Sequence, residues 1–369
     1  MKILNVNILN NNYKIIIGYK ILDKISEEIN KIFQNYLTKS FFIISDRNVF
    51  KLYGENLKNV LKRDGFNDIG SIVFSSGEKS KSWKEYGNIL KKIIQFDSGK
   101  KKNIIILNLG GGVVGDIGGF VASTYRRGIP YIQIPTTLLA CVDSSIGGKV
   151  GVDFKVNSKI IKNIIGNFYQ PKMVFMDLFY LKTLPKKEIL NGLAEIIKYG
   201  IIKDKKLFEY TQQHLDKIID LCPENIEYVV EKSSNIKKII VEKDEKETKS
   251  IRTILNFGHT IGHAIEGAYE LRYTHGEAIS IGMVVESKIS CELGLFKKQQ
   301  FDKIINLISM SGLPVKLPNN RKTDKIIDVM NYDKKFKSGK NRFVLPVDIG
   351  KVIIKENISD NLIRKSIDT

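Results

Sequence analysis

The sequence predicts an α/β N-terminal domain followed by a mainly α-helical C-terminal domain. Short apolar runs alternate with helical periodicity in the first half, which is typical of a parallel sheet covered by helices. After Asp177 most segments carry the 3.6-residue periodicity of amphipathic helices. A chain of 369 residues is long enough for two hydrophobic cores. We therefore expect one domain over residues 1–180 and a second over residues 181–369.

The individual elements follow from the period of each apolar run. Strands are expected at residues 41–45, 103–109, 131–134 and 342–345. The glycine-rich segment 110–116 is expected to form a turn before a helix at 118–122. A helix at 83–96 should bury one side, composed of Trp83, Tyr86, Leu90, Ile93 and Ile94. Further helices are expected at residues 188–199, 207–221, 226–241, 260–269 and 278–293.

Composition excludes several classes of protein. The chain is 43% hydrophobic and 27% charged, which is ordinary for a folded soluble protein. Its net charge of +19 raises the alternative of a nucleic-acid-binding or membrane-surface protein. However, the lysines are scattered among isoleucine and asparagine and form no stripe with interleaved aromatic residues. We therefore expect no nucleic-acid or membrane partner, and assign part of the charge to attraction of an anionic substrate.

The cysteines and the N-terminus indicate the compartment. Cys141, Cys222 and Cys291 are too far apart for a disulfide framework or a cysteine-pair metal site, so thiols in a reducing cytoplasm are expected. The N-terminal residues lack the apolar core of a signal peptide, and no run is long enough to span a bilayer.

Three of the four histidines lie close together in the sequence. His259 and His263 are four residues apart and would project from one helix face, and His275 follows where the chain is expected to turn back. Imidazole is a common zinc ligand, and a catalytic zinc keeps three protein ligands and one open position. A cluster of this kind beside Glu247, Arg252 and Asn256 predicts a site rather than isolated core histidines.

Glu195 and Lys198 form a second candidate pair, one helical turn apart. A solvated ion pair is the alternative interpretation. The apolar residues Leu193, Ala194, Ile196 and Ile197 favour a partly buried helix instead. A buried carboxylate requires a partner, and a metal ion is one.

Polar groups follow each predicted strand of the first half. Asp46, residues 76–81, the segment 110–116 and Thr136-Thr137 all stand at strand ends, where open α/β sheets bind dinucleotides. Glycines before a helix allow phosphate to approach its N-terminus, although 110–116 lacks the GxGxxG spacing and a plain tight turn is the alternative. The next segment places Asp143 and Lys149 around two serines and a Gly-Gly pair.

Six motifs together resemble the 3-dehydroquinate synthase family of sugar-phosphate cyclases. They are GGGVVGD at 110–116, PTTLLAxVDSSIGGK at 135–149, NxIGxFYQP at 163–171, GLAEIIKYG at 192–200, LNFGHTxGHAIE at 255–266 and DKK at 333–335. The match runs in the family's order from Asp46 to about residue 350. Two stretches depart from the family's pattern. Residues 149–163 are longer than usual, and the pair Lys162-Asn163 lacks the glycine that customarily precedes it. The loop 244–252 is also longer than usual.

The resemblance implies a role for many residues. It implies that Glu195, His259 and His275 hold one divalent metal ion, zinc or cobalt. It implies that NAD is contacted by Asp46, Ser76, Gly77, Glu78, Lys79, Ser80, Lys81, Gly112, Val113, Val114, Gly115, Asp116, Thr136, Thr137, Lys149, Lys162, Tyr180, Leu181, Lys182 and Thr183. The substrate would be contacted by Asp143, Lys149, Asn163, Lys198, Lys237, Glu247, Arg252, Asn256, His263 and one residue of the pair Lys334-Lys335. Arg127 would reach across the interface of a homodimer.

The implied reaction belongs to the shikimate pathway of aromatic amino acid biosynthesis. A phosphorus–oxygen lyase of this family converts 3-deoxy-D-arabino-heptulosonate 7-phosphate to 3-dehydroquinate and phosphate. Transient oxidation by NAD acidifies a neighbouring proton so that phosphate can leave, and re-reduction, ring opening and an intramolecular aldol step follow. The metal stabilises negative charge on oxygen, and basic side chains suit the carboxylate and phosphate.

Some alternatives stay open. The general base is either His263 or the phosphate of the substrate itself. Another sugar-phosphate cyclase, or a metal-dependent polyol dehydrogenase that releases reduced cofactor, is the alternative activity.

Overall fold

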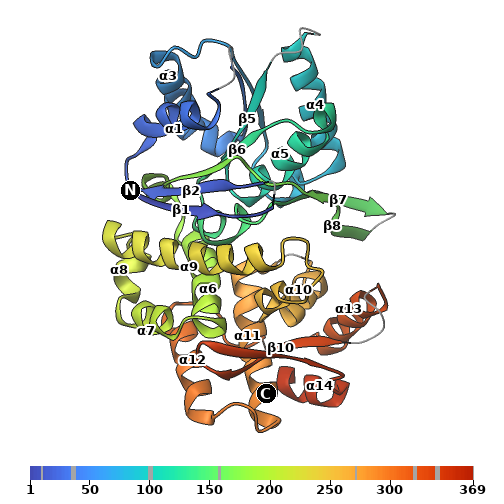
Figure 1. The fold of residues 1–369 in the computed structure, drawn as a ribbon. Coiled ribbons are helices and arrows are strands. Elements are labelled where there is room, and N and C mark those ends of the chain that lie inside the picture. Colours follow the sequence, from blue (N-terminus) through green and yellow to red (C-terminus); the bar gives the residue numbers. More distant parts are fainter. Residues whose placement is uncertain are drawn as a thin grey trace. The chain divides into compact units, whose positions relative to one another are not determined.

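The computed structural model describes residues 1–9, 11–34, 39–98, 103–156, 159–270, 272–318, 322–336 and 341–368, without the side chains of 159–160 and 332–336. The chain divides into two compact units, Met1–Leu184 and Pro185–Thr369, whose elements are labelled in Figure 1. The first contains a mostly parallel sheet and the second is mostly helical. The predicted fold class is therefore confirmed.

One sheet organises the first unit. Its strands within the described residues run in the order β1 (Lys2–Val6), β2 (Tyr13–Gly18), β9 (Met173–Asp177), β6 (Tyr131–Pro135), β5 (Ile104–Gly110), β3 (Ser40–Asp46), β4 (Ile69–Phe74). Neighbouring strands pair in parallel except β1 with β2. The central strands are buried on both faces, so they read as continuous apolar runs rather than as alternating ones.

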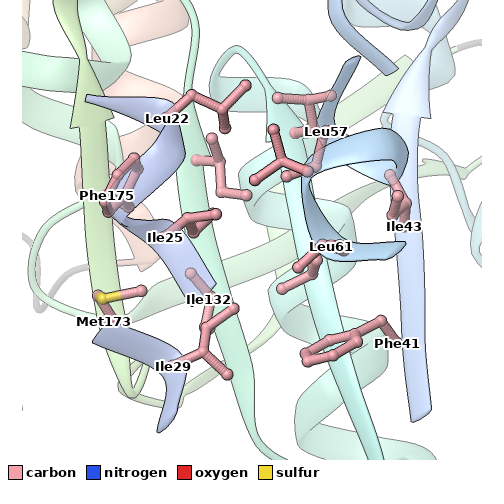
Figure 2. Close-up of a cluster of buried hydrophobic side chains, with 14 of the residues drawn as sticks. Leu22, Ile25, Ile29, Phe41, Ile43, Leu57, Leu61, Ile132, Met173 and Phe175 are labelled. Carbon is pink, nitrogen blue, oxygen red and sulfur yellow. The ribbon is translucent and has the colours of Figure 1, made fainter. Parts of the chain in front are cut away.

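Helices cover both faces of this sheet. One face carries α1 (Ile25–Ile32) and α3 (Glu55–Arg63), and the other carries α4 (Trp83–Asp97) and α5 (Gly112–Thr124). Successive residues of β3 alternate between them: Phe41 and Ile43 pack with α1 and α3, as Figure 2 shows, while Phe42 and Ile44 pack with α4 and α5. The short helix α2 (Arg47–Val49) and a π-helical turn, Phe50–Gly54, lead into α3.

The buried face of α4 differs from the predicted one. Tyr86, Ile89 and Ile93 are buried, whereas Trp83 and Ile94 are 49% and 56% exposed. At 100° per residue the apolar stripe of this helix is wider than the surface available to it, and the contact is centred nearer Ile89. The prediction that Trp83 and Ile94 share the core face is therefore wrong.

The glycine-rich segment after β5 is helical rather than a turn. Helix α5 begins at Gly112, with Gly111 as its N-cap residue. A Cβ at Gly118 would overlap the side chain of Asn108, and one at Gly119 would overlap Val150. These glycines thus let α5 lie close against Asn108 and Val150. The predicted turn over 110–116 is wrong, because the backbone is already helical from Gly112.

The longer stretch between Lys149 and Asn163 forms a β-hairpin that periodicity did not predict. Its strands are β7 (Lys149–Val156) and β8 (Lys159–Phe168), paired antiparallel. A Cβ at Gly151 or Gly166 would lie 2.6 Å or less from a carbonyl oxygen of the opposite strand, so glycine is required where the strands approach.

The second unit is mainly helical. Its elements are α6 (Lys186–Ile202), α7 (Lys205–Gln213), α8 (Leu215–Ile219), α9 (Pro223–Lys243), α10 (His259–Ala268), α11 (His275–Glu292), α12 (Lys298–Met310), α13 (Thr323–Phe336), α14 (Asp360–Asp368) and a hairpin of β10 (Arg342–Asp348) with β11 (Lys351–Glu356). The single helix predicted at 207–221 is wrong, because the backbone leaves helical geometry at His214. Both pieces bury one face, so the periodicity continued across the break. Among the described residues no helix has the length and apolar character required to cross a membrane.

Helices α10 and α11 touch backbone to backbone. A Cβ at Gly282 would overlap the carbonyl oxygen of Gly258, and one at Gly262 would lie 3.1 Å from Cα of Ile279. Gly258 has φ +77°, a conformation that side chains disfavour. The crossing point therefore depends on glycine in both helices.

We expect Gly282→Ala to lower the free energy of unfolding by roughly 3 kcal/mol, since an added methyl group forces a tight contact apart. Gly87→Ala is the control, because nothing lies within 4 Å of a Cβ there. It should be neutral or stabilise helix α4 by up to about 1 kcal/mol. Urea denaturation followed by circular dichroism measures both, and equal midpoints for the two variants would contradict the proposed contact.

Candidate functional site

Three helices of the second unit bring a carboxylate and two imidazoles together. Glu195 lies on α6 and is fully buried, and His259 and His275 are the first residues of α10 and α11. Nε2 of His259 and Nε2 of His275 lie 3.3 and 3.2 Å from Oε1 of Glu195. A tetrahedral ion with bonds of ~2.1 Å separates neighbouring ligand atoms by ~3.4 Å. The three donor atoms, all within 4.8 Å of one another, therefore have the spacing of a zinc-type site.

The second nitrogen of each imidazole faces an acceptor. Nδ1 of His259 lies 3.0 Å from the carbonyl oxygen of Phe257, and Nδ1 of His275 lies 3.8 Å from Oε1 of Glu266. Without a metal ion, Nε2 of His275 is within hydrogen-bond distance of Glu195. Burial alone would lower the pKa of His275, but contacts with Glu195 and Glu266 outweigh burial and raise this pKa to about 9. A metal ion would take the place of the proton on Nε2, and the acceptors beside Nδ1 suit a proton retained there. Sequence reasoning missed Glu266, although a carboxylate seven residues after His259 on an apolar helix was an available signal.

Electrostatics at Glu195 favour the charged form. Burial alone would raise its pKa, but the Lys198 ammonium together with His259 and His275 holds the pKa well below the usual range. Lys198 is itself buried and forms an ion pair with Glu195, so the alternative of a solvated surface pair is excluded. Burial and Lys198 lower the pKa of His259, which favours the neutral imidazole that a metal requires.

Both histidine-bearing helix ends are held by defined contacts. Thr274 and Glu277 form a reciprocal capping box at the start of α11, and Asn191 accepts a hydrogen bond from the backbone N–H of Gly276 at 2.5 Å. At the start of α10, the buried carboxylate of Glu286 accepts the backbone N–H of Gly258 at 2.8 Å. These contacts fix the backbone beside His275 and His259.

The other predicted residues of this unit occupy neighbouring elements. Arg252 is buried, donates from Nη1 to the carbonyl of Glu245 at 2.8 Å, and its Nε lies 3.5 Å from Glu247. His263 is exposed on α10, with its ring centroid 5.3 Å from that of His259. Asn256 is exposed just before α10, and Lys237 is buried on α9, which packs against α6. Lys334 and Lys335 lie on α13, but their side chains are outside the described residues.

One further carboxylate shapes the loop that carries Glu247 and Arg252. Asp244 accepts backbone N–H groups from Lys249, Ile251 and Arg252 at 3.0–3.1 Å. Burial opposes ionisation, but these donors lower the pKa of Asp244. Sequence reasoning missed this contribution, because it depends on the folded path of the loop.

In the first unit, the predicted polar groups lie at the carboxyl ends of adjacent strands. Strand β3 has β4 on one side and β5 on the other, so the connections reverse direction there, where open α/β sheets bind ligands. Asp46 ends β3, and its Oδ1 accepts from Ser76 Oγ at 2.6 Å and from the backbone N–H of Asn48 at 2.9 Å. Asp46 therefore links the ends of β3 and β4.

The N-terminus of α5 has the character of a phosphate site. No side chain of the described residues caps it, since Gly111 is the N-cap residue. Gly112, Val113, Gly115 and Asp116 of its first turns are partly exposed, while Val114 is buried. The buried hydroxyl oxygens of Thr136, Ser144 and Ser145 have no hydrogen-bond partner within the part of the chain that the structure describes, and a Cβ at Gly112 would lie 3.0 Å from Ser144 Oγ. Unsatisfied hydroxyl groups near an uncapped helix start suit a polar ligand such as a dinucleotide.

A polar network lies between the segment after β4 and the β7–β8 hairpin. Nζ of Lys81 contacts Oδ2 of Asp116 and Oδ1 of Asn163. Lys162 lies 3.9 Å from Glu78, which like Gly77 and Lys79 is exposed. Ser80 donates to the carbonyl of Ser75 at 2.5 Å.

The remaining predicted residues are spread over the first unit. Tyr180 is buried and its ring packs 4.4 Å from that of Tyr53, whose hydroxyl lies 2.7 Å from Thr183 Oγ1. Leu181 is buried, and Lys182 is exposed. The hydroxyl of Thr137 accepts the backbone N–H of Ala140, and Asp143 lies in a π-helical turn. Lys149 is exposed at the start of β7, and Arg127 is exposed in a turn where its φ is +62°.

Comparison with solved structures defines the class of fold. A 2-deoxy-scyllo-inosose synthase complexed with carbaglucose-6-phosphate, NAD+ and Co2+ superposes with a TM-score of 0.87 at 24% identity, covering 100% of this chain and 99% of that one. The 2-epi-5-epi-valiolone synthase of Streptomyces hygroscopicus subsp. jinggangensis 5008, with NAD+ and Zn2+ bound, gives a TM-score of 0.83 at 25% identity, covering 96% and 95%. The fold is that of the sugar-phosphate cyclases.

Sequence comparison specifies the family within this class. Residues 71–191 match the profile described as 3-dehydroquinate synthase N-terminal, and residues 192–336 match 3-dehydroquinate synthase C-terminal. The 3-dehydroquinate synthase of Thermoanaerobacter sp. (strain X514) is 48% identical over 95% of this chain and 96% of its own length. The chain belongs to the 3-dehydroquinate synthase family.

We expect the stability of the protein to depend on pH through Glu286. Burial raises the pKa of Glu286 to about 8, although backbone N–H groups of Gly258, Ile261 and Thr260 oppose the shift. A raised pKa means that the folded state favours the protonated form, so stability is full below the ordinary pKa of a glutamate and is lost as pH rises towards 8.

Glu286→Gln keeps an acceptor for Gly258 and removes this titration. The free energy of unfolding of Glu286→Gln should exceed that of the wild type by an amount that increases from pH 5 to pH 8.5. At pH 8.5 this difference should reach roughly 2–4 kcal/mol. Urea midpoints at both pH values measure the difference, and exposed Glu209→Gln is the control. A constant difference across this range would contradict the expectation.

Proposed function

We propose that this chain converts 3-deoxy-D-arabino-heptulosonate 7-phosphate to 3-dehydroquinate and phosphate, as a lyase of the shikimate pathway. The observation that carries the proposal is the convergence of Glu195, His259 and His275 on one point beside Lys198, in a chain 48% identical to a 3-dehydroquinate synthase. The substrate carries a phosphate and a carboxylate, which an acidic or purely apolar pocket would not bind. The basic side chains of the second unit suit both anionic groups.

We also propose NAD and one divalent metal ion as cofactors. Solved cyclases of this fold hold NAD+ with Zn2+ or Co2+, and the spacing of the donor atoms suits either ion. When bound, the metal supplies Lewis-acid stabilisation of negative charge on substrate oxygen, and NAD supplies reversible hydride transfer.

The protein side chains hold and orient the reactants. Glu195, His259 and His275 would hold the metal, while the carbonyl of Phe257 and the carboxylate of Glu266 face Nδ1 of the two imidazoles and would accept a proton there. The uncapped start of α5 offers N–H groups to the pyrophosphate of NAD, and Asp46 offers a carboxylate acceptor to its hydroxyl groups.

Cationic and amide groups of the second unit bind the substrate. Lys198, Lys237 and Arg252 are buried, so their charge acts on an anion with little screening by water. Asn256 and Glu247 add a neutral donor and an acceptor. His263 is exposed and is not one of the three proposed metal ligands, so it is our candidate for proton transfer, together with the phosphate of the substrate.

The proposed assembly is a homodimer in which Arg127 completes the neighbouring site. Its turn contains two consecutive left-handed residues, Arg126 and Arg127, before Gly128. The buried carboxylate of Asp97 accepts from Arg126 and from the Tyr125 hydroxyl, which holds the turn in this shape. A rigid turn of this kind suits the presentation of Arg127 to a partner.

The activity is tested by measuring phosphate release from the heptulosonate phosphate, with absorbance at the NADH band recorded in parallel. We expect release that requires added Zn2+ or Co2+, stops with a chelator and leaves no NADH. Steady accumulation of NADH would instead indicate a polyol dehydrogenase. Release from another ketose or hexose phosphate alone would indicate a different cyclase.

Metal binding is tested with His275→Ala, which leaves Glu195 paired with Lys198. We expect the affinity for Co2+, measured by calorimetry and by the visible spectrum of the ion, to fall by about a hundredfold or more, because two ligands replace three. His214→Ala is the matched control, since His214 lies on another part of the unit beside Tyr210. Equal losses in both variants would contradict the assigned ligand set.

A further inference from the structure

The β7–β8 hairpin carries a buried aspartate, Asp153. The pairing register shifts between Val152 and Phe154, and Asp153 lies opposite a bulge formed by residues 162–164 of β8. Its backbone N–H donates to the carbonyl oxygen of Lys81 at 2.9 Å, and the residue is only 9% exposed. Asp153 thus attaches the hairpin to the segment that follows β4.

The Asp153 carboxylate holds the backbone of Asn163 on the opposite strand. Oδ1 of Asp153 accepts the backbone N–H of Asn163 at 2.8 Å. Asn163 has φ +53°, a left-handed conformation that asparagine tolerates better than most residues but that still needs support from its surroundings. The hydrogen bond replaces a ladder bond lost at the bulge and fixes this conformation.

The same arrangement orients the Asn163 amide. Oδ1 of Asn163 accepts from the buried ammonium of Lys81, which also contacts Asp116. With its oxygen engaged, the exposed amide presents its NH2 group as a donor, which suits a hydroxyl or anionic oxygen of a ligand. Burial raises the pKa of Asp153, and the contact with Asn163 and the charge of Lys81 oppose this shift.

We propose that Asp153 is a positioning residue that presets Asn163 for substrate. The proposal rests on the proposed function, in which Asn163 contacts the sugar phosphate. Asp153 would act through Asn163 and would not touch the substrate itself. It would also connect the substrate-binding hairpin to Lys81 and Asp116, the residues assigned to NAD.

Asp153→Ala and Asp153→Asn separate the hydrogen bond from the charge. Alanine removes the acceptor for the Asn163 N–H, whereas asparagine retains an oxygen at the same place. We expect Asp153→Ala to raise KM for the heptulosonate phosphate about tenfold, the effect of one buried hydrogen bond, with kcat changed less. Asp153→Asn should restore KM to within about threefold of the wild type. Asp23→Ala, at an exposed aspartate paired with Arg63, is the control.

The single tryptophan provides a readout that is independent of activity. Trp83 packs against Phe154 of the hairpin, with ring centroids 6.1 Å apart. If Asp153 only positions Asn163, the emission spectrum of Trp83 and the melting temperature should stay close to wild type in Asp153→Ala. If Asp153 instead holds the whole hairpin in place, the emission should shift to longer wavelength and the protein should melt earlier.

Three results would overturn the proposal: an unchanged KM in Asp153→Ala, an equal defect in Asp153→Asn, or a KM defect accompanied by the shift in Trp83 emission. Asn163→Ala distinguishes failure of the underlying assignment. An unchanged KM in Asn163→Ala would show that Asn163 does not contact substrate, and the inference would fall with that part of the proposed function. A raised KM in Asn163→Ala with an unchanged KM in Asp153→Ala would overturn the inference alone.

Discussion

The second unit depends on the burial of one carboxylate. Glu195 has no exposure to solvent, and an isolated buried charge is too costly to persist. Lys198 supplies positive charge from the same helix, while His259 and His275 supply polar nitrogen atoms from two other helices. The requirement for positive charge that keeps Glu195 ionised also makes the position suitable for a metal cation. Stability and chemistry therefore use the same contacts.

Glycine and capping contacts give this requirement its geometry. Gly258 and Gly282 let α10 and α11 meet through their backbones, which brings the first residue of each helix towards Glu195. The capping box at Thr274 and the carboxylate of Glu286 then fix where each helix starts. Each imidazole belongs to the first residue of its helix and moves with the helix end. Small changes in these glycine and capping contacts would therefore displace His259 or His275 from its position beside Glu195.

The first unit meets a different requirement, which is to gather polar groups at one edge of a buried sheet. Parallel strands end together, so Asp46, the start of α5 and Thr136 become neighbours without any special sequence motif. The β7–β8 hairpin adds Asn163 to this edge through Lys81 and Asp153. Its glycines permit the close strand contact, and its bulge directs the side chains.

The sequence by itself determined the patterns that are local along the chain. The fold class, the strands before Asp46 and Gly110, the pairing of Glu195 with Lys198 and the placement of His259 and His263 on one helix all follow from periodicity and spacing, which depend on residues a few positions apart. Tertiary structure alone decided which face of α4 is buried, where α5 begins, how β7 pairs with β8, and that Glu286 and Asp153 support other residues. Each of these depends on contacts between elements distant in sequence, whose partners no single helix or strand pattern specifies.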